Sequence, residues 1–279
     1  MRMVTYRSER GARAGVLVGD GVLDAWDLLG GEQSSVREVL ASDRVEELRV
    51  AAEGAPSPTL SDAELLPPIT DPDKIVCIGL NYRSHAAEAG MDPPESPTFF
   101  AKFRNALAPP GATVTLPAAS SKVDYEAEVA FVIGRRCSQV DEVDAGGYVA
   151  GYMLFNDLSA RDLQFATPQW MPGKVFDGSA PCGPALVTPE EGEVDGSVSF
   201  SLELNGEVMQ ESSTDDLIFG VPELVARLSR LMTLEPGDVV STGTPSGVGS
   251  TRDPRVWLKA GDEIVISSPT LGRLETRIA

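Results

Sequence analysis

The sequence predicts a mainly β fold of the α+β class, organised as a small N-terminal domain and a larger second domain. Apolar and polar residues alternate over many short segments, which is the period of half-buried strands. A single segment shows clear helical spacing. Prolines, which break regular structure, gather in one region: Pro56, Pro58, Pro67, Pro68 and Pro72. We therefore expect domains spanning residues 1–65 and 66–279.

The N-terminal domain is expected to begin with short strands joined by tight turns. Residues 15–18 and 22–23 are apolar and flank Gly19-Asp20-Gly21, which predicts a β-hairpin. Residues 36–52 have a helical pattern that ends near Gly54.

The second domain is predicted to consist mostly of strands. The segments are 75–78, 127–133, 152–155, 197–204, 207–210, 263–267 and 271–278. Segment 127–133 becomes apolar on both faces, so we expect it in the centre of a sheet. Asn205-Gly206 favours a type I′ hairpin turn. Pro222 lies near the start of a core-packing helix whose apolar residues recur at helical spacing: Val221, Leu224, Val225, Leu228, Leu231 and Met232.

The composition excludes several classes of function. The chain has 279 residues, with 23 Lys and Arg against 42 Asp and Glu, and a formal charge of −19. Such a chain repels nucleic acid and anionic lipid, so we expect neither as a partner. Three distant cysteines, Cys77, Cys137 and Cys182, support neither a disulfide framework nor a cysteine zinc site. With no apolar leader and no run near the roughly 18 residues of a membrane span, a soluble cytoplasmic protein is expected.

Carboxylates are spaced as a metal site would require. Asp124, Glu126 and Glu128 alternate along a predicted strand, so they share one face. An exposed edge strand would present the same pattern to solvent, but here the strand runs into an apolar segment, which favours burial. Buried carboxylates repel one another, and oxygen ligands suit Mg²⁺ or Mn²⁺. Asp157, at the end of the strand 152–155, is a further candidate ligand or a helix N-cap.

The single histidine and two lysines are further candidate catalytic groups. His85 is the only imidazole available as a general base, and Glu88 follows it at helical spacing. The same pair would also suit an ordinary surface helix. Lys102 and Lys174 lie among aromatic residues and glycines, where each could face an oxyanion or remain a surface lysine. The loop Gly243–Gly249 has neither the Gly-Lys-Ser/Thr ending of a P-loop nor the G-x-G-x-x-G pattern of a dinucleotide-binding turn. Its backbone and Thr244 could still contact a small anion.

Taken together, these motifs resemble the fumarylacetoacetate hydrolase superfamily over residues 70–279. The matching residues are Gly79, Asn81, Tyr82, His85 and Glu88, then Glu126-Ala127-Glu128, Asp157, Arg161-Asp162, Gln164, Gly173-Lys174 and Thr242–Gly249. The resemblance is closest to a bacterial branch of acylpyruvate hydrolases, oxaloacetate decarboxylases and catechol-pathway isomerase/decarboxylases. It implies a mixed β-sandwich roll with a small N-terminal domain.

The resemblance also implies roles for individual residues. The metal ligands would be Glu126, Glu128 and Asp157, holding Mg²⁺ or, as an alternative, Mn²⁺. The catalytic residues would be His85, Glu88 and Lys174, of which the first two activate water. The substrate-binding residues would be Arg161, Gln164, Lys102 and Thr244. Asp124 would have a supporting or structural role.

The function expected from this resemblance is hydrolysis of a carbon–carbon bond in a small 2-oxo acid such as an acylpyruvate, in aromatic compound catabolism. Oxaloacetate decarboxylation and catechol-pathway isomerisation on the same site stay open, as does a non-enzymatic protein that holds a structural ion. We expect a homodimer. The segment 90–97, rich in proline and glycine, is expected to form a lid over the site.

Overall fold

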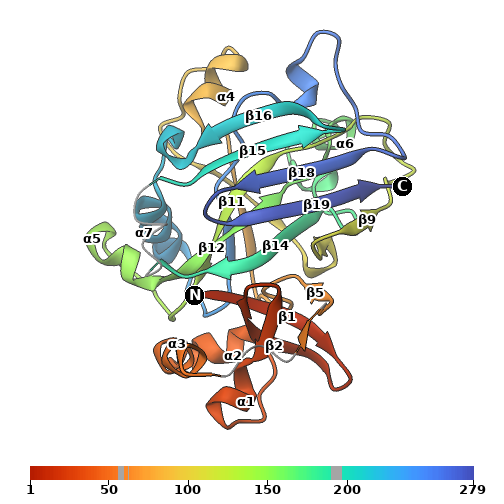
Figure 1. Cartoon of the computed structure of the whole chain (residues 1–279). Helices are drawn as coiled ribbons and strands as arrows, with labels where there is room; N and C mark the ends of the chain where they lie inside the picture. The colour runs from red at the N-terminus through yellow and green to blue at the C-terminus, as the bar shows by residue number, and fades with distance from the viewer. Residues whose placement is uncertain (56–59, 62, 190–196) are drawn as a thin grey trace.

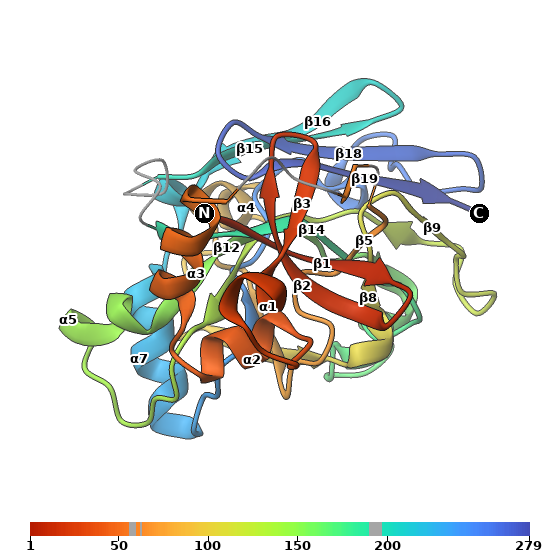
Figure 2. The same ribbon diagram turned by 60° about the horizontal axis from the view of Figure 1, so that its bottom comes forward.

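The computed structural model describes residues 1–55, 60–61, 63–189 and 197–279. Its regular structure is mostly β, as predicted, and Figure 1 shows two layers of strands with helices at their periphery. The N-terminal strands and helices lie together at one end of the molecule, and Figure 2 brings that end forward. In the part of the chain described, no helix is long and apolar enough to cross a membrane.

The N-terminal region contains a three-stranded meander flanked by helices. Its elements are β1 (Arg2–Ser8), β2 (Gly11–Val18), β3 (Gly21–Asp24), α1 (Ala25–Leu29), α2 (Val36–Ala41), α3 (Val45–Glu53), β4 (Leu60–Ser61) and β5 (Leu65–Leu66). The predicted hairpin is confirmed as β2–β3, and the predicted helical segment forms α2 and α3. β5 spans the expected domain boundary and pairs with β1, and the boundary itself stays a prediction.

A large mixed sheet joins this region to the rest of the chain. Within the described residues it has twelve strands in the order β4-β3-β2-β1-β14-β12-β11-β17-β6-β7, with β5 on β1 and β8 on β14. The later strands are β6 (Ile75–Gly79), β7 (Thr98–Lys102), β8 (Leu107–Ala108), β11 (Ala127–Ile133), β12 (Val149–Asn156), β14 (Ala180–Val187) and β17 (Val239–Ser241). β11 is buried along its whole length between β12 and β17, which confirms the central position expected for it.

A second sheet packs against the first and completes a sandwich. Its order is β16-β15-β18-β19-β9, from β9 (Ala112–Val114), β15 (Ser199–Leu204), β16 (Glu207–Ser213), β18 (Glu263–Ser268) and β19 (Gly272–Ile278). Side chains of both sheets, such as Val129, Leu154, Leu202 and Ile266, form one buried core between them. The turn at Asn205-Gly206 has positive φ at both residues, 53° and 82°, as a type I′ turn requires.

Helices pack on both faces of the large sheet: those of the N-terminal region share a core with Ala130 and Val132, and another helix lies on the face of the second sheet, in a core with Phe131 and Ile133. α7 (Val221–Leu231) buries Leu224, Val225 and Leu228 against residues of β6, β11 and β17, so its predicted role in the core is confirmed. The remaining helices are α4 (Arg83–Glu88), α5 (Glu142–Ala145) and α6 (Arg161–Gln164). A short pair, β10 (Val123–Asp124) with β13 (Ser159–Ala160), lies beside the candidate site.

Candidate active site

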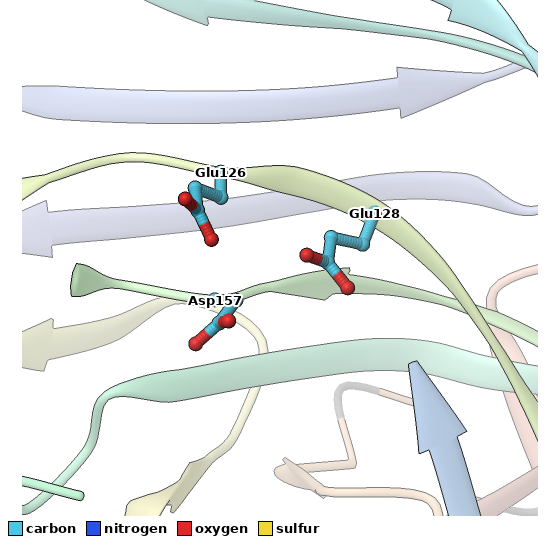
Figure 3. A group of neighbouring side chains, drawn as sticks. All are labelled: Glu126, Glu128 and Asp157. Carbon is cyan, nitrogen blue, oxygen red and sulfur yellow. The ribbon is translucent and has the colours of Figure 1, made fainter. Parts of the chain in front are cut away.

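Three acidic side chains converge on the face of the large sheet that points away from the second sheet, because Glu126 and Glu128 alternate with Ala127 and Val129 of the core between the sheets. Glu126 precedes β11, Glu128 lies within β11, and Asp157 follows β12. One carboxylate oxygen of each lies within 4.8 Å of the others, and all three residues are buried. Figure 3 shows the carboxylates pointing toward one another. The expected set of metal ligands is therefore assembled in one place.

The strand pairing brings these residues together. β11 and β12 are antiparallel, with Ala127 opposite Asn156, and the Asp157 amide donates to the Glu126 carbonyl at 2.9 Å. The Asn156 side chain accepts a hydrogen bond from the Glu126 amide at 3.2 Å. Because both strands lie in the centre of the sheet, main-chain hydrogen bonds hold the three carboxylates at short range.

Two buried lysines and an arginine neutralise part of this charge. Lys174 Nζ lies 2.6 Å from Glu126 and 2.7 Å from Asp157, and Lys102 Nζ lies 2.6 Å from the other Asp157 oxygen. Arg161 contacts Glu126 at 2.6 Å. Burial opposes the charge on Lys174, yet Asp157 and Glu126 raise its pKa above the usual value. Burial also opposes ionisation of Glu126, but Arg161 and Lys174 hold its pKa well below the usual range.

Glu128 is in a different electrostatic environment. One of its oxygens accepts hydrogen bonds from the Ser241 hydroxyl and, at 3.0 Å, from the Gly243 amide. Among the described residues it has no ion pair. Burial, together with the charges of Asp157 and Glu126, raises its pKa well above the usual value. A third carboxylate without its own cation, in an all-oxygen donor set, fits a hard divalent cation.

Asp124 and Lys102 have surroundings that the sequence did not indicate. Asp124 is not part of the group of three carboxylates, although Val123, Tyr125, Ala127 and Val129 share one core as the alternation predicts. Its carboxylate accepts from Arg161 at 2.9 Å and from the Gly249 and Ser250 amides at 2.8 and 3.0 Å, and its supporting role stays a prediction.

Lys102, expected to bind substrate, is fully buried against Asp157 and is not among the described residues that line the cavity. Its ammonium group also lies 3.5 Å from the Leu158 carbonyl. In this position Lys102 is paired with a candidate metal ligand, and its role in substrate binding stays a prediction.

His85 and Glu88 lie beside the glycine loop Gly243–Gly249, where the chain leaves strands β6 and β17. β6 and β17 are parallel, so the segments that follow them lie side by side. His85 Nδ1 is 3.2 Å from one Glu88 oxygen, while the Gly247 amide donates to the other at 2.9 Å. These bonds hold the pKa of Glu88 below its usual value, although its burial opposes this. Gly247 has φ of 97°, and a Cβ there would lie 2.1 Å from the Met209 carbonyl oxygen.

A cavity of about 650 Å³ opens beside the carboxylates. It is lined by seven of the predicted site residues: His85, Glu126, Glu128, Arg161, Gln164, Lys174 and Thr244. Met91 and Pro94, from the expected lid, also line it. Lining residues that the sequence did not single out include Ile78, Phe100, Lys122, Trp170, Arg255 and Trp257. No local motif marked these residues, because separate segments bring them to the cavity.

Comparison with known proteins agrees with this architecture. The family model for the fumarylacetoacetate (FAA) hydrolase C-terminal domain matches residues 74–279. The oxaloacetate tautomerase FAHD2A, mitochondrial, of Bos taurus is 41% identical over 220 residues, covering 78% of this chain and 70% of that protein. The fumarylacetoacetate hydrolase domain-containing protein 2 homolog of Dictyostelium discoideum is 45% identical over 219 residues, covering 75% and 72%.

Solved structures are similar over the whole chain. The fumarylacetoacetate hydrolase of Exiguobacterium antarcticum has a TM-score of 0.88 and 33% identity, covering 100% of this chain and 99% of that one. The maleylpyruvate hydrolase of Sphingobium sp. SYK-6, in complex with manganese(II) ion and pyruvate, has a TM-score of 0.82 and 28% identity, with coverage of 100% and 99%. The fold expected from the sequence is therefore confirmed.

Proposed function

We propose that this chain, which belongs to the fumarylacetoacetate hydrolase family, is a divalent-metal-dependent enzyme that cleaves a carbon–carbon bond in a small 2-oxo acid such as an acylpyruvate. Members of this family are enzymes. The observation that carries the proposal is the group of three buried carboxylates, within 4.8 Å of one another, beside a cavity that also contains His85.

Glu126, Glu128 and Asp157 would hold the ion, which we propose to be Mg²⁺, with Mn²⁺ as an alternative. Bound there, a divalent cation would act as a Lewis acid toward the oxygens of a 2-oxo acid. Three protein carboxylates leave part of an octahedral shell for water or substrate, which argues against a closed structural site. Non-enzymatic ion binding would instead be indicated by metal-dependent stability without turnover of any 2-oxo acid.

His85 is the proposed general base. Glu88 engages Nδ1, which leaves Nε2 to take a proton from water. The water oxygen then bonds to C4 of the acylpyruvate and the C3–C4 bond breaks, with its electron pair left on C3. A proton returns to C3, giving pyruvate and a carboxylic acid. Lys174 lines the cavity and holds its positive charge beside the substrate as negative charge develops.

Oxaloacetate chemistry is the second candidate. The Bos taurus relative is named an oxaloacetate tautomerase. Decarboxylation of oxaloacetate on the same site would release C4 as CO₂ without an attacking water, and isomerisation would return the proton to a different carbon. His85 would therefore be needed for hydrolysis and not for decarboxylation.

Pyruvate release tests these alternatives. Purified protein is assayed with acylpyruvates and with oxaloacetate, in Mg²⁺ and in EDTA, and the proposal expects metal-dependent release from acylpyruvates. In His85→Ala, kcat for acylpyruvates should fall by about 10²- to 10⁴-fold, while any oxaloacetate activity persists. Release from oxaloacetate alone favours the second candidate. An unchanged acylpyruvate rate in His85→Ala contradicts the role of His85.

The proposal includes a cytoplasmic homodimer. Symmetric homodimers are the commonest oligomers. Light scattering on the purified protein and fractionation of cells that express it would test the two parts separately.

A further inference from the structure

Gln210 is a buried polar residue that has no part in the mechanism described above. It lies in β16 of the second sheet, is 1% exposed, and is not among the described residues that line the cavity. The pairing with β15 shifts by one residue between Val208 and Gln210, so Met209 is the extra residue of a β-bulge. Met209 and Gln210 are therefore both buried, although regular alternation would expose one of them. Bulges of this kind redirect side chains and are common beside active sites.

The side-chain amide of Gln210 connects two segments of the candidate active site. Its Oε1 accepts a hydrogen bond at 2.9 Å from the amide of Ala127, the residue between two of the candidate metal ligands. Its Nε2 donates to Thr244 Oγ1 at 2.9 Å and lies 3.1 and 3.4 Å from the carbonyl oxygens of the next two residues of the glycine loop. The Thr244 hydroxyl in turn donates to the Ala127 carbonyl at 3.0 Å. One planar group thus joins the ligand strand to the loop.

The glycine loop Gly243–Gly249 contacts the site on both sides of this connection. The first amide of the loop donates to Glu128 at 3.0 Å, and the Gly247 amide donates to Glu88 at 2.9 Å. The three residues between these two contacts are the ones that the side-chain amide of Gln210 bonds. The placement of Glu88 relative to the metal ligands therefore depends on where the loop is held.

We propose that Gln210 is a positioning residue, which holds the glycine loop against the ligand strand and thereby keeps Glu88, and with it His85, in place for catalysis. The inference rests on the proposed function for the reaction that it serves. Without the side-chain amide, the buried Ala127 amide and two loop carbonyls lose a partner, and the loop is free to shift. A displacement of about 1 Å at a catalytic group can slow a reaction about 10²-fold.

Two variants and a double-mutant cycle test the inference. Gln210→Met removes both the donor and the acceptor, whereas Gln210→Glu keeps an oxygen for the Ala127 amide and loses the donor to the loop. In Mg²⁺ we expect kcat for acylpyruvate hydrolysis to fall about 10- to 100-fold in both. If Gln210 acts through Glu88, the same substitutions made in Glu88→Ala should lower kcat further by about twofold or less. Loss of folding in Gln210→Met would leave the isosteric Gln210→Glu to carry the test.

Asn205→Asp is the matched control for Gln210→Glu. Asn205 is a side-chain amide at the turn of the same β15–β16 hairpin, and it donates to Asp262 at 3.0 Å and accepts from the Glu263 amide at 2.9 Å. Its change to aspartate also keeps an acceptor and loses a donor. We expect it to lower Tm and to leave kcat at the wild-type value.

Hydrogen exchange of the loop amides gives a readout that does not require turnover. The Gly247 amide should exchange about tenfold faster in Gln210→Glu than in the wild type, since local opening no longer breaks the bonds to the side-chain amide. Amides of β18 in the same sheet should keep their wild-type rates.

The outcomes separate this inference from the proposed function. Unchanged exchange of the loop in both Gln210 variants overturns the inference and leaves the proposed function standing. Independent, fully additive effects of Gln210→Met and Glu88→Ala on kcat also overturn it, because lost stability rather than the placement of Glu88 would then explain the slower reaction. If the wild type releases no pyruvate from any acylpyruvate, the proposed function fails, and the exchange rates alone decide whether Gln210 holds the loop.

Discussion

Glu126 and Glu128 are two residues apart and differ in the way their charges are compensated, so the same substitution should have opposite effects on stability. Glu126 is paired with Arg161 and Lys174, both at 2.6 Å. Glu128 is bonded only to neutral donors among the described residues, the Ser241 hydroxyl and the Gly243 amide. Without metal, Glu128 carries the less compensated charge.

Glu128→Gln should stabilise the metal-free protein. The amide oxygen of glutamine can keep both hydrogen bonds, while the unpaired buried charge is removed. We expect a gain of about 1–2 kcal/mol in the free energy of unfolding, or a rise in Tm of about 2–8 °C. Glu126→Gln is the matched control. It leaves two buried cations with one fewer partner each, which should cost about 3 kcal/mol.

The pH dependence has a defined sign. The pKa of Glu128 is raised in the folded protein, so its contribution to stability is fully present below the unfolded value of about 4.3 and is lost as pH rises through the folded pKa. Glu128→Gln lacks this titration. The difference in Tm between the variant and the wild type should therefore grow from pH 5 toward pH 8.

Thermal unfolding in EDTA and in Mg²⁺ provides the assay. With Mg²⁺ at a hundred times its Kd, the wild type should gain about 2.7 kcal/mol, whereas both variants should gain much less because each lacks a ligand. In EDTA we expect Tm to fall in the order Glu128→Gln, wild type, Glu126→Gln. In Mg²⁺ the wild type should have the highest Tm of the three. If Glu128→Gln melts as early as Glu126→Gln in EDTA, the electrostatic reasoning is wrong.

Two further substitutions probe packing and the N-terminal region. A Cβ at Gly79 would lie 2.1 Å from Trp170 Cζ3, so Gly79→Ala should displace the indole from the cavity wall, cost about 1–3 kcal/mol and raise KM. Gly146→Ala, with nothing within 4 Å of the new Cβ, should change neither quantity. Asp24→Asn should cost about 3 kcal/mol at pH 7, because Asp24 is 6% exposed and bonded to Arg13 at 2.5 Å. Burial opposes ionisation of Asp24, but Arg13 lowers its pKa, so this stabilisation is present above about pH 3.9 and lost as pH falls. Urea unfolding at pH 7 and pH 3 should show a large and then a small effect of Asp24→Asn.

Local pattern determined much of the secondary structure. Period-two alternation identified strands such as β11 and β15, and Asn205-Gly206 identified its turn because both residues tolerate positive φ. Such features depend on neighbours a few residues away, so the sequence alone is enough to predict them. The motifs of the candidate site could be recognised in the sequence for the same reason, since Glu126 and Glu128 lie two residues apart.

The tertiary structure alone decided which charges meet. Lys102 contacts Asp157, 55 residues along the chain, and Asp124 contacts the Gly249 amide, 125 residues away. Arg255 lines the same cavity as Glu126, 129 residues away along the chain. Local sequence does not predict such pairings, because the free energy of a buried ion pair depends on which groups the sheet order brings within a few ångströms. The sequence determined the strands and the chemical groups, and the packing of the sheets decided which groups neutralise one another and which line the cavity.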